Sequence, residues 1–444
     1  MGKALKIRSH IAILMSALLA GPVLLQRSVR AEDVSGPILV FDPDSGNVIS
    51  QNRAGEPWYP ASLTKLMTAY VIFTKLKAGT IKLDDKFTVS QLAFSQPASR
   101  IGLPVGKTIS VDLALQALLV YSANDMAYVL AEGADGSIEN FAREMNATAQ
   151  SMGLAATHFV NPNGLYDPRH LSSARDIGII AQRVLKDFPE YAHYFAQENV
   201  VIGKRTLNNH NGLIRTMDEA IGMKTGFICP SGYNLVGAAE RDGKRVITVM
   251  LGARSSAKRT KATQQLLEDG FSQIGQPGQD PISSIKDQAY GAIVPADMTT
   301  TVCKQKAPVT PVNAHHLEGW GISFGTYDTA IKADMALRGR LISPVGIDAG
   351  GTPGVIALPS KAGFAAMLWG LDQPRSESLC SKYKAENASC DVMSDVLLLQ
   401  MAAAAQPEAA QAAGPSEDEG ADSPDVKPPS PKKPAVKGKP HKKN

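Results

Sequence analysis

The chain has 444 residues and a formal net charge of +4, and its 44% apolar composition is enough to fill the cores of two or three domains. The charge is uneven, because residues 1–31 carry five cations and no acid, and residues 427–444 carry seven lysines and no acid. The part between them therefore has a net charge of −8. An acidic body argues against nucleic-acid binding, since phosphate neutralisation requires clustered cations.

The amino terminus has the pattern of an export signal. A cationic stretch precedes the apolar run Ile11–Leu25, and Val29–Ala31 supplies small residues at the −3 and −1 positions of a cleavage site. The alternative is an uncleaved membrane anchor, which needs about 20 apolar residues and is not favoured by this shorter run. We expect cleavage after Ala31 and a mature chain in the periplasm or cell envelope, soluble or at most peripherally attached.

Residues 32–275 read as one body that contains both strands and helices. Strand-like sequence opens it at Pro37–Ser50, and two more such segments, Tyr233–Ala239 and Arg245–Leu251, close it around a turn. Helical periodicity fills the middle, at residues 61–76, 111–120, 125–132 and 173–186. We therefore expect an α/β sandwich, of α+β or α/β class, whose sheet brings the two ends of this body together.

The rest of the chain divides into three parts. Residues 276–316 are rich in proline and weakly periodic, which predicts a linker. Residues 317–400 predict a small α+β module of βαββαβ form, with strands at 320–327, near Val345 and at 354–359, helices at 328–340 and near 362–371, and a last strand at 390–393. Residues 401–444 lack large apolar side chains and predict a disordered, lysine-rich tail.

The chain has four cysteines, which can form disulfides in an oxidising compartment. Three pairings are open to four cysteines, and buried free thiols are the alternative. Cys380 and Cys390 are the nearest in sequence and flank one predicted turn, so we expect this pair first.

Three short motifs occur in order in the first body: Ser62–Lys65 (SLTK), Ser122–Asn124 (SAN) and Lys224–Gly226 (KTG). Each motif alone is weak. A Ser-x-x-Lys sequence is usually a capped helix start, and Ser-x-Asn is usually a local turn. Together they are informative, because the first opens a predicted helix and the second falls at a break between helical stretches. The third opens a predicted strand, either Tyr233–Ala239 or the one just before it.

The residue types suit acyl transfer. Ser62 and Lys65 are three residues apart on a helix, so their side chains can meet. A serine hydroxyl is a poor nucleophile until a base takes its proton, and a lysine can be that base if burial or a second cation, here Lys224, lowers its pKa. Gly226 leaves room for a substrate backbone, and the Phe227 N–H together with the Ser62 N–H can form an oxyanion hole.

The motifs and their surroundings resemble the serine D-Ala-D-Ala carboxypeptidases, the low-molecular-mass penicillin-binding proteins. The resemblance covers residues 35–275 and rests on the sequences PASLTKLMTAYVIF, YSANDMA, SMGLAATHFVNPNGLYDPRHLSSARDI, RTLNNHNGLI and MKTGFICPSGYNLVGAAERDGKRVITVMLGARSSAKR. It implies a β-lactamase/transpeptidase-like fold, a mainly antiparallel sheet flanked by helices. It also implies that peptidoglycan stem peptides are the substrate, that β-lactams are covalent inhibitors, and that no metal or cofactor is needed.

The resemblance also implies roles for individual residues. Ser62 would be the acylated nucleophile and Lys65 its base. Ser122 and Asn124 would form the second element, passing a proton to the leaving amine and holding the substrate amide or Lys65. Lys224 and Thr225 would bind the terminal carboxylate of the substrate. Arg259 matches the arginine that these enzymes place behind the third motif, and the alternative for it is a solvated arginine at a helix start.

Two departures from the family stand out. Phe227 follows the third motif where some relatives carry a polar residue, which leaves the backbone donor intact but can alter substrate preference. The carboxyl end is a lysine-rich run instead of an amphipathic membrane-surface helix, and residues 392–405 lack the aromatic and basic side chains of such an anchor. We interpret 392–405 as the edge of a domain, and expect at most weak contact of the lysine run with anionic lipid or polymer.

Other functions remain open. A β-lactamase is disfavoured because no Glu-x-x-Leu-Asn element follows Asn124, and a non-catalytic wall-binding protein is disfavoured because all three motifs are intact. D,D-endopeptidase activity would use the same machinery. Residues 317–393 also resemble the sporulation-related repeat (SPOR), which implies binding of glycan strands by residues 317–400; the alternative is a structural spacer.

Overall fold

The computed structural model describes residues 34–288, 293–303, 317–358 and 363–401. The predicted export signal at residues 1–31 and residues 402–444 of the predicted tail lie outside these ranges. Among the helices of the described ranges, none is both long and apolar enough to span a membrane.

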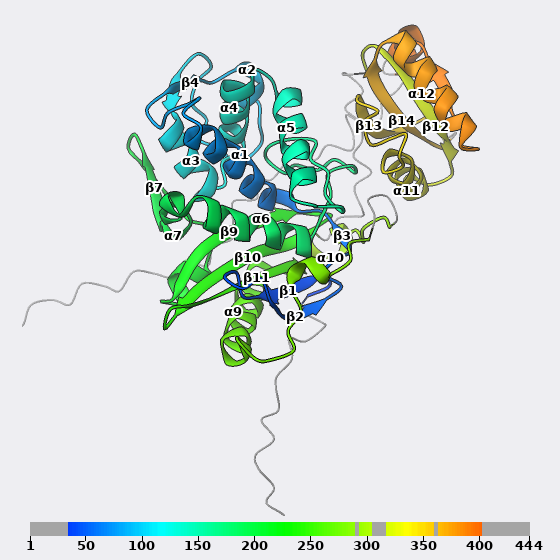
Figure 1. The fold of residues 1–444 in the computed structure, drawn as a ribbon. Coiled ribbons are helices and arrows are strands. Elements are labelled where there is room, and N and C mark those ends of the chain that lie inside the picture. Colours follow the sequence, from blue (N-terminus) through cyan, green and yellow to red (C-terminus); the bar gives the residue numbers. More distant parts are fainter. Residues whose placement is uncertain (1–33, 289–292, 304–316, 359–362, 402–444) are drawn as a thin grey trace, which may run out of the picture.

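A five-stranded antiparallel sheet forms the centre of the first body (Figure 1). Its strands are β1 (Ile38–Phe41), β2 (Val48–Asn52), β9 (Ala220–Ile228), β10 (Gly232–Arg241) and β11 (Lys244–Ala253). Their order in the sheet is β2-β1-β11-β10-β9, so β1 pairs with β11 and the two ends of the body are adjacent, as predicted. The α+β class is confirmed, and β9 is an edge strand.

Both faces of the sheet are buried, because side chains alternate between them along each strand. In β1, Leu39 and Phe41 belong to the core that the sheet shares with the helices, whereas Val40 faces the opposite side with α9. Figure 1 shows the bundle of helices on one face and α9 on the other. The helices of this body are α1 (Lys65–Lys77), α2 (Gln91–Phe94), α3 (Val111–Leu119), α4 (Asn124–Asp135), α5 (Ile138–Ser151), α6 (Ala174–Asp187), α7 (His193–Ala196), α8 (Leu213–Thr216) and α9 (Ser256–Gln273).

Five of these helices lie outside the four predicted ranges, and α5 and α9 are the long ones among them. Each begins at a serine whose side chain accepts a hydrogen bond from a backbone N–H of the first turn. In α5, Ser137 accepts from Asn140, and in α9, Ser255 accepts from Lys258. Three two-stranded ribbons complete the body: β3 (Pro57–Trp58) with β6 (Ser172–Ser173), β4 (Lys86–Thr88) with β5 (Thr108–Ser110), and β7 (Asn199–Ile202) with β8 (Arg205–Asn208).

The prediction of a loose linker over 276–316 was wrong for much of its described part. Ile282, in the 3-10 turn Ile282–Ser284, is buried in the main core, and Asp287 forms an ion pair with Arg175 at 2.5 Å. Farther along, α10 (Thr299–Val302) leads to Cys303, which is disulfide-bonded to Cys229. In the described part of 276–316, prolines and weak periodicity therefore belong to a segment of irregular backbone. This segment packs against the body through a few side chains and one disulfide.

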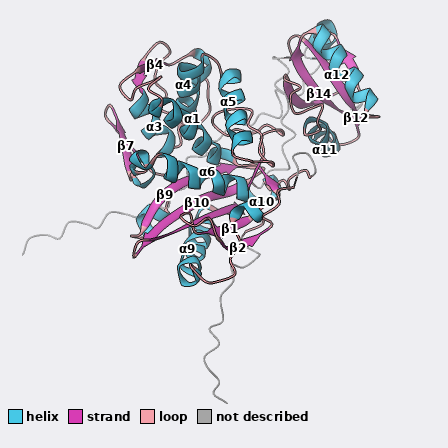
Figure 2. Ribbon diagram, viewed as in Figure 1, coloured by secondary structure: helices cyan, strands magenta, loops and turns pink. Residues whose placement is uncertain are grey.

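The carboxyl-terminal unit has the predicted βαββαβ element order. Its elements are β12 (Trp320–Tyr327), α11 (Ala330–Leu341), β13 (Thr352–Ala357), β14 (Phe364–Leu371), α12 (Gln373–Ala385) and β15 (Asp391–Met393). The strands form one sheet in the order β13-β14-β12-β15, and Figure 2 shows the two helices beside it. Hereafter this unit is called the C-terminal module.

Two of its predicted elements were misplaced. The segment expected as a helix near 362–371 contains strand β14, and the helix, α12, follows it. Both faces of strand β14 are buried, since Ala366 and Leu368 belong to one apolar cluster and Met367 and Trp369 to another. Its sequence is therefore nearly all apolar, a pattern that does not separate a buried strand from a helix. Val345, expected in a strand, lies in a turn. The predicted Cys380–Cys390 disulfide is present and ties α12 to the start of β15.

Candidate active site

The first motif forms a tight turn that leads into a helix. Ser62 lies in the 3-10 turn Ala61–Thr64, and α1 begins directly after it. Ala61 has a positive φ of 49°, a conformation that costs free energy for a residue with a side chain and persists only where its surroundings hold it. Asn234 of β10 supplies part of that support, because its side-chain amide donates to the carbonyl oxygens of Tyr59 and Pro60 at 3.0 and 3.2 Å.

Two glycines let neighbouring backbone approach this turn. A Cβ on Gly164, whose φ is +84°, would lie 1.9 Å from the Ala61 carbonyl oxygen. A Cβ on Gly226 would lie 2.9 Å from the Pro60 carbonyl oxygen and 3.2 Å from the Ser62 nitrogen. The third motif therefore passes directly beside the nucleophile turn, which requires glycine at both positions.

Lys65 joins the first two motifs. Its ammonium nitrogen, Nζ, donates hydrogen bonds of 2.8 Å to Ser62 Oγ, to Asn124 Oδ1 and to the carbonyl oxygen of Asn163. The side chain is completely buried. Burial and, next, the charge of Lys224 hold the pKa of Lys65 well below its ordinary value, although Asp125 opposes them. Lys65 is thus placed and tuned to take a proton from Ser62.

The second motif follows α3 in a strained turn. Ser122 has a positive φ of 64° and is buried, and Asn124 begins α4. The Asn124 side chain is fixed on its other side, where its amide nitrogen donates to the carbonyl oxygens of Pro97 and Ala98 at 3.0 and 3.2 Å. Asn124 therefore presents its oxygen to Lys65.

The third motif lies inside strand β9. Lys224 and Thr225 are buried, whereas Phe227 is 40% exposed and its ring packs on Tyr233 with the centroids 4.2 Å apart. Burial and then the nearby charge of Arg259 lower the pKa of Lys224 to about 7. Because β9 is at the edge of the sheet, its outer side faces the nucleophile turn and not another strand.

Arg259 is buried, so the alternative of a solvated arginine was wrong. It lies in the first turn of α9, and its Nη2 donates to the carbonyl oxygen of His210 at 3.3 Å and to Ser256 Oγ at 3.1 Å, while its buried Nε has no partner. Burial lowers its pKa to about 10. His210, which was not among the predicted site residues, is affected by the same charges. Burial and then the charges of Lys224 and Arg259 lower the pKa of His210 to about 4.

Lys65, Lys224 and Arg259 thus form a buried cationic cluster. Among the described residues none of the three is ion-paired with a carboxylate, and their hydrogen bonds go to hydroxyl, amide and carbonyl oxygens. Burying unpaired cations is costly, and each cation lowers the pKa of the next. A ligand that brings a carboxylate would relieve that cost.

The structure therefore brings together Ser62, Lys65, Asn124, Lys224, Gly226 and Arg259. Ser122 is buried two residues before Asn124, and within the described residues no hydrogen bond of its side chain to the others is seen. Thr225 is placed between Lys224 and the close approach at Gly226, although no side-chain hydrogen bond of Thr225 is seen. Sequence reasoning missed Asn163, which holds Lys65 through a backbone carbonyl, and Asn234, which holds the turn from a strand 172 residues away from Ser62. Neither has a local sequence signal beyond lying within the quoted family-like segments.

Comparison with known proteins gives one family. A family model described as Peptidase S11, D-alanyl-D-alanine carboxypeptidase, matches residues 26–255. The D-alanyl-D-alanine carboxypeptidase DacA of Haemophilus influenzae is 34% identical over 55% of this chain and 66% of its own length, so the alignment spans just under two thirds of that relative.

Solved structures give the same result. Penicillin-binding protein 5 from Haemophilus influenzae has 34% identity and a TM-score of 0.52, with 53% of this chain and 70% of that chain covered. Penicillin-binding protein D2 from Listeria monocytogenes, solved in a cefotaxime-bound form, has 31% identity and a TM-score of 0.50, with 54% and 98% covered.

Proposed function

Because the chain belongs to the D-alanyl-D-alanine carboxypeptidase family, we propose that it removes the terminal D-alanine from the pentapeptide stems of peptidoglycan. The observation that carries this proposal is the buried cationic cluster of Lys65, Lys224 and Arg259, which lacks a carboxylate and borders a serine hydrogen-bonded to a lysine of lowered pKa. A peptide that ends in a carboxylate supplies the missing charge.

The edge strand supports the proposed binding mode. An extended peptide can pair with the free outer side of β9, and its terminal carboxylate would lie at Lys224, Thr225 and Arg259. Gly226 lets the nucleophile turn lie directly beside this strand, which would put Ser62 next to the bound peptide. The carbonyl between the last two D-alanines would then reach the Ser62 hydroxyl.

The proposed reaction is acyl transfer in two halves. Lys65, in its neutral form, takes the proton of Ser62 while Oγ attacks the carbonyl carbon, and the N–H groups of Ser62 and Phe227 stabilise the oxyanion. The intermediate collapses by breaking the C–N bond, and the amine of D-alanine leaves with a proton passed from Lys65 or Ser122. Water, deprotonated by Lys65, then hydrolyses the acyl-serine ester. A β-lactam would acylate the same serine, as the cefotaxime-bound relative suggests.

We further propose that the protein acts outside the cytoplasm, in the periplasm or cell envelope. Support comes from the signal-like sequence of residues 1–31 and from the two disulfides, which persist in oxidising compartments. Trimming of stems there would affect cell-wall biogenesis and cell shape. Any membrane contact is peripheral, through the lysine-rich end of the chain.

The test uses labelled penicillin and pentapeptide muropeptides with the wild-type protein and a Ser62→Ala variant. We expect one adduct, mapped to Ser62 by mass spectrometry, and release of D-alanine by the wild type alone. Adduct formation without D-alanine release would leave a binding role, and rapid hydrolysis of penicillin with intact pentapeptide would favour a β-lactamase. Cross-linked dimers in the same assay separate carboxypeptidase from endopeptidase activity.

A second function is favoured by the element order of the C-terminal module. Its βαββαβ order and four-stranded sheet fit the SPOR resemblance of residues 317–400, and we propose that the module binds glycan strands. The experiment is pelleting of the full chain with glycan strands stripped of stem peptides, with a Ser62→Ala background to exclude the catalytic site. No enrichment over an unrelated protein of similar charge would contradict this proposal.

A further inference from the structure

Arg338 lies where the C-terminal module meets the catalytic body. It belongs to the last turn of α11, and only 5% of its surface is exposed. Figure 1 shows α11 on the side of the module that faces the catalytic body. Burying a guanidinium at such a contact costs free energy unless its N–H groups donate hydrogen bonds. The groups that accept those hydrogen bonds therefore identify the segments that Arg338 holds in place.

The partners of Arg338 come from three segments outside the module. Nη1 donates to the Tyr59 hydroxyl at 3.1 Å, and Nη2 donates to Asp297 Oδ2 at 2.8 Å. The guanidinium also lies over the rings of Tyr59 and Tyr166, 5.8 and 5.3 Å from their centroids. Within α11, Nε is ion-paired with Asp334 at 2.6 Å.

The first of these segments carries the nucleophile. Tyr59 is three residues before Ser62, and it is fully buried. Its carbonyl oxygen accepts the Asn234 amide that supports the turn, and its hydroxyl accepts the hydrogen bond from Arg338. Tyr59 is therefore fixed at both ends, once from the sheet and once from the module.

The second segment holds the base. Tyr166 is three residues after Asn163, whose carbonyl oxygen accepts the hydrogen bond from Lys65. In the same loop Arg169 donates to the carbonyl oxygens of Gly350 and Gly351 in the module, at 3.1 and 3.3 Å. The module thus contacts this loop at two residues, Tyr166 and Arg169.

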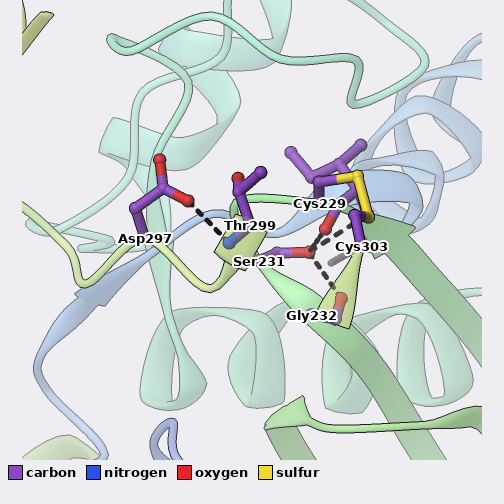
Figure 3. Close-up of a disulfide and its surroundings, with 7 residues drawn as sticks. Cys229, Ser231, Gly232, Asp297, Thr299 and Cys303 are labelled. Carbon is purple, nitrogen blue, oxygen red and sulfur yellow. Dashed lines mark hydrogen bonds between the residues drawn. A yellow bond between two sulfur atoms is a disulfide. The ribbon is translucent and has the colours of Figure 1, made fainter. Parts of the chain in front are cut away.

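The third segment is linked to the end of strand β9 by a hydrogen bond and a disulfide. Asp297 precedes α10, and its neighbour Met298 donates its backbone N–H to the carbonyl oxygen of Pro230 at 3.0 Å. Figure 3 shows the disulfide between Cys229, directly after β9, and Cys303 beside this segment. Arg338 is consequently joined through Asp297 to the end of the strand that carries the third motif.

We propose that Arg338 is a positioning residue, through which the C-terminal module holds the nucleophile turn, the Lys65-binding loop and the end of β9 in one arrangement. The inference rests on the proposed function. Arg338 does not touch the reacting atoms. It contacts Tyr59 and Tyr166 directly, whereas it is linked to Lys224 and Thr225 indirectly, through Asp297 and the end of β9. Its loss should therefore affect the chemical step far more than binding of the terminal carboxylate.

The test compares full-length variants in the D-alanine release assay. Arg338→Ala should lower kcat by about tenfold with KM changed less than about twofold, since small displacements of catalytic groups are costly. Arg338→Lys, which keeps the charge but not the fork of donors, should recover part of the loss. Lys332→Ala is the matched control, because Lys332 lies on the same helix, is exposed, and is ion-paired with Asp328 inside the module.

A second readout separates positioning from a general loss of stability. If the Asn163 loop loosens, Lys65 becomes better hydrated and its pKa rises. The acid limb of the kcat/KM profile should then move to higher pH in Arg338→Ala and not in Lys332→Ala. If circular dichroism shows that Arg338→Ala is misfolded, Asp297→Asn replaces it with the same expected pattern.

The outcomes are distinct. A wild type that neither releases D-alanine nor is acylated by penicillin contradicts the proposed function itself. If the wild type is active, and the folded Arg338→Ala variant equals Lys332→Ala in kcat and in pH profile, this inference alone is overturned. A fall in kcat with the shifted acid limb supports it.

Discussion

Lys65 donates a 2.8 Å hydrogen bond to the hydroxyl of Ser62 from a fully buried position. Replacing it with arginine keeps a cation there but removes the base, because arginine does not lose its proton in proteins. We expect Lys65→Arg to slow acylation by penicillin by a factor of about 10² to 10⁴, measured by stopped-flow or gel-based labelling. Lys77→Arg, near the end of the same helix, is the control and should keep the wild-type rate.

The pH dependence of activity should be bell-shaped. Lys65 must be neutral to act, so kcat/KM rises as pH increases through its lowered pKa. Lys224 must be charged to bind a carboxylate, so kcat/KM falls above its pKa of about 7 in the free enzyme. Because Arg259 lowers that pKa, Arg259→Gln should move the alkaline limb to higher pH. An unmoved limb would show that Lys224 does not set it.

Arg259 should contribute to recognition of the terminal carboxylate. Hydrogen bonds to charged groups are worth about 1.5–3 kcal/mol, so Arg259→Gln should raise KM by about 10- to 100-fold for an acyl-D-Ala-D-Ala substrate. For the same substrate with an amidated carboxyl terminus, wild type and variant should be equally poor. If the variant weakens both substrates by the same factor, Arg259 acts through the fold and not through the carboxylate.

A buried pair of carboxyl groups, Asp176 and Asp287, predicts how stability depends on pH. Burial and then Asp287 raise the pKa of Asp176 to about 8, whereas an unfolded aspartate ionises near about 3.9. Between these values the folded chain binds more protons than the unfolded chain, so stability falls as pH rises, by up to about 1.4 kcal/mol per pH unit. Asp176→Asn should flatten this slope in thermal unfolding from about pH 4 to about pH 8. Asp84→Asn, at an exposed site, should keep the wild-type slope.

Much of the site was predictable because its residues carry local signals. Ser62 and Lys65 are three residues apart at a helix start, and Gly226 lies beside a buried lysine on a strand. Asn234 and Asn163 gave no such signal, since their roles depend on a side-chain amide and a backbone carbonyl that long-range folding brings to the turn and to Lys65. The local sequence around Asn234 or Asn163 does not show which distant residue each one contacts in the folded chain.

The fold was predicted where periodicity was strong. In the first body the predicted ranges match strands β1, β2, β10 and β11 and helices α1, α3, α4 and α6. In the C-terminal module β14 was predicted as a helix, because a strand covered on both faces has no alternation to reveal it. The contact of Arg338 with Tyr59 joins residues 279 positions apart, and an arginine in a helix is usually solvated. Nothing in the sequence distinguishes this arginine from its neighbours.

The edge position of β9 has a consequence for the solubility of the protein. An open edge strand is a template on which other chains can aggregate, and proteins usually protect such edges with charges, bulges or covering segments. Here the turn from Pro60 to Leu63 lies against the edge at Gly226, within 3.2 Å of where a Cβ would stand. The turn thus covers part of this edge, so β9 offers a second copy of the chain less unpaired backbone than a bare edge strand would.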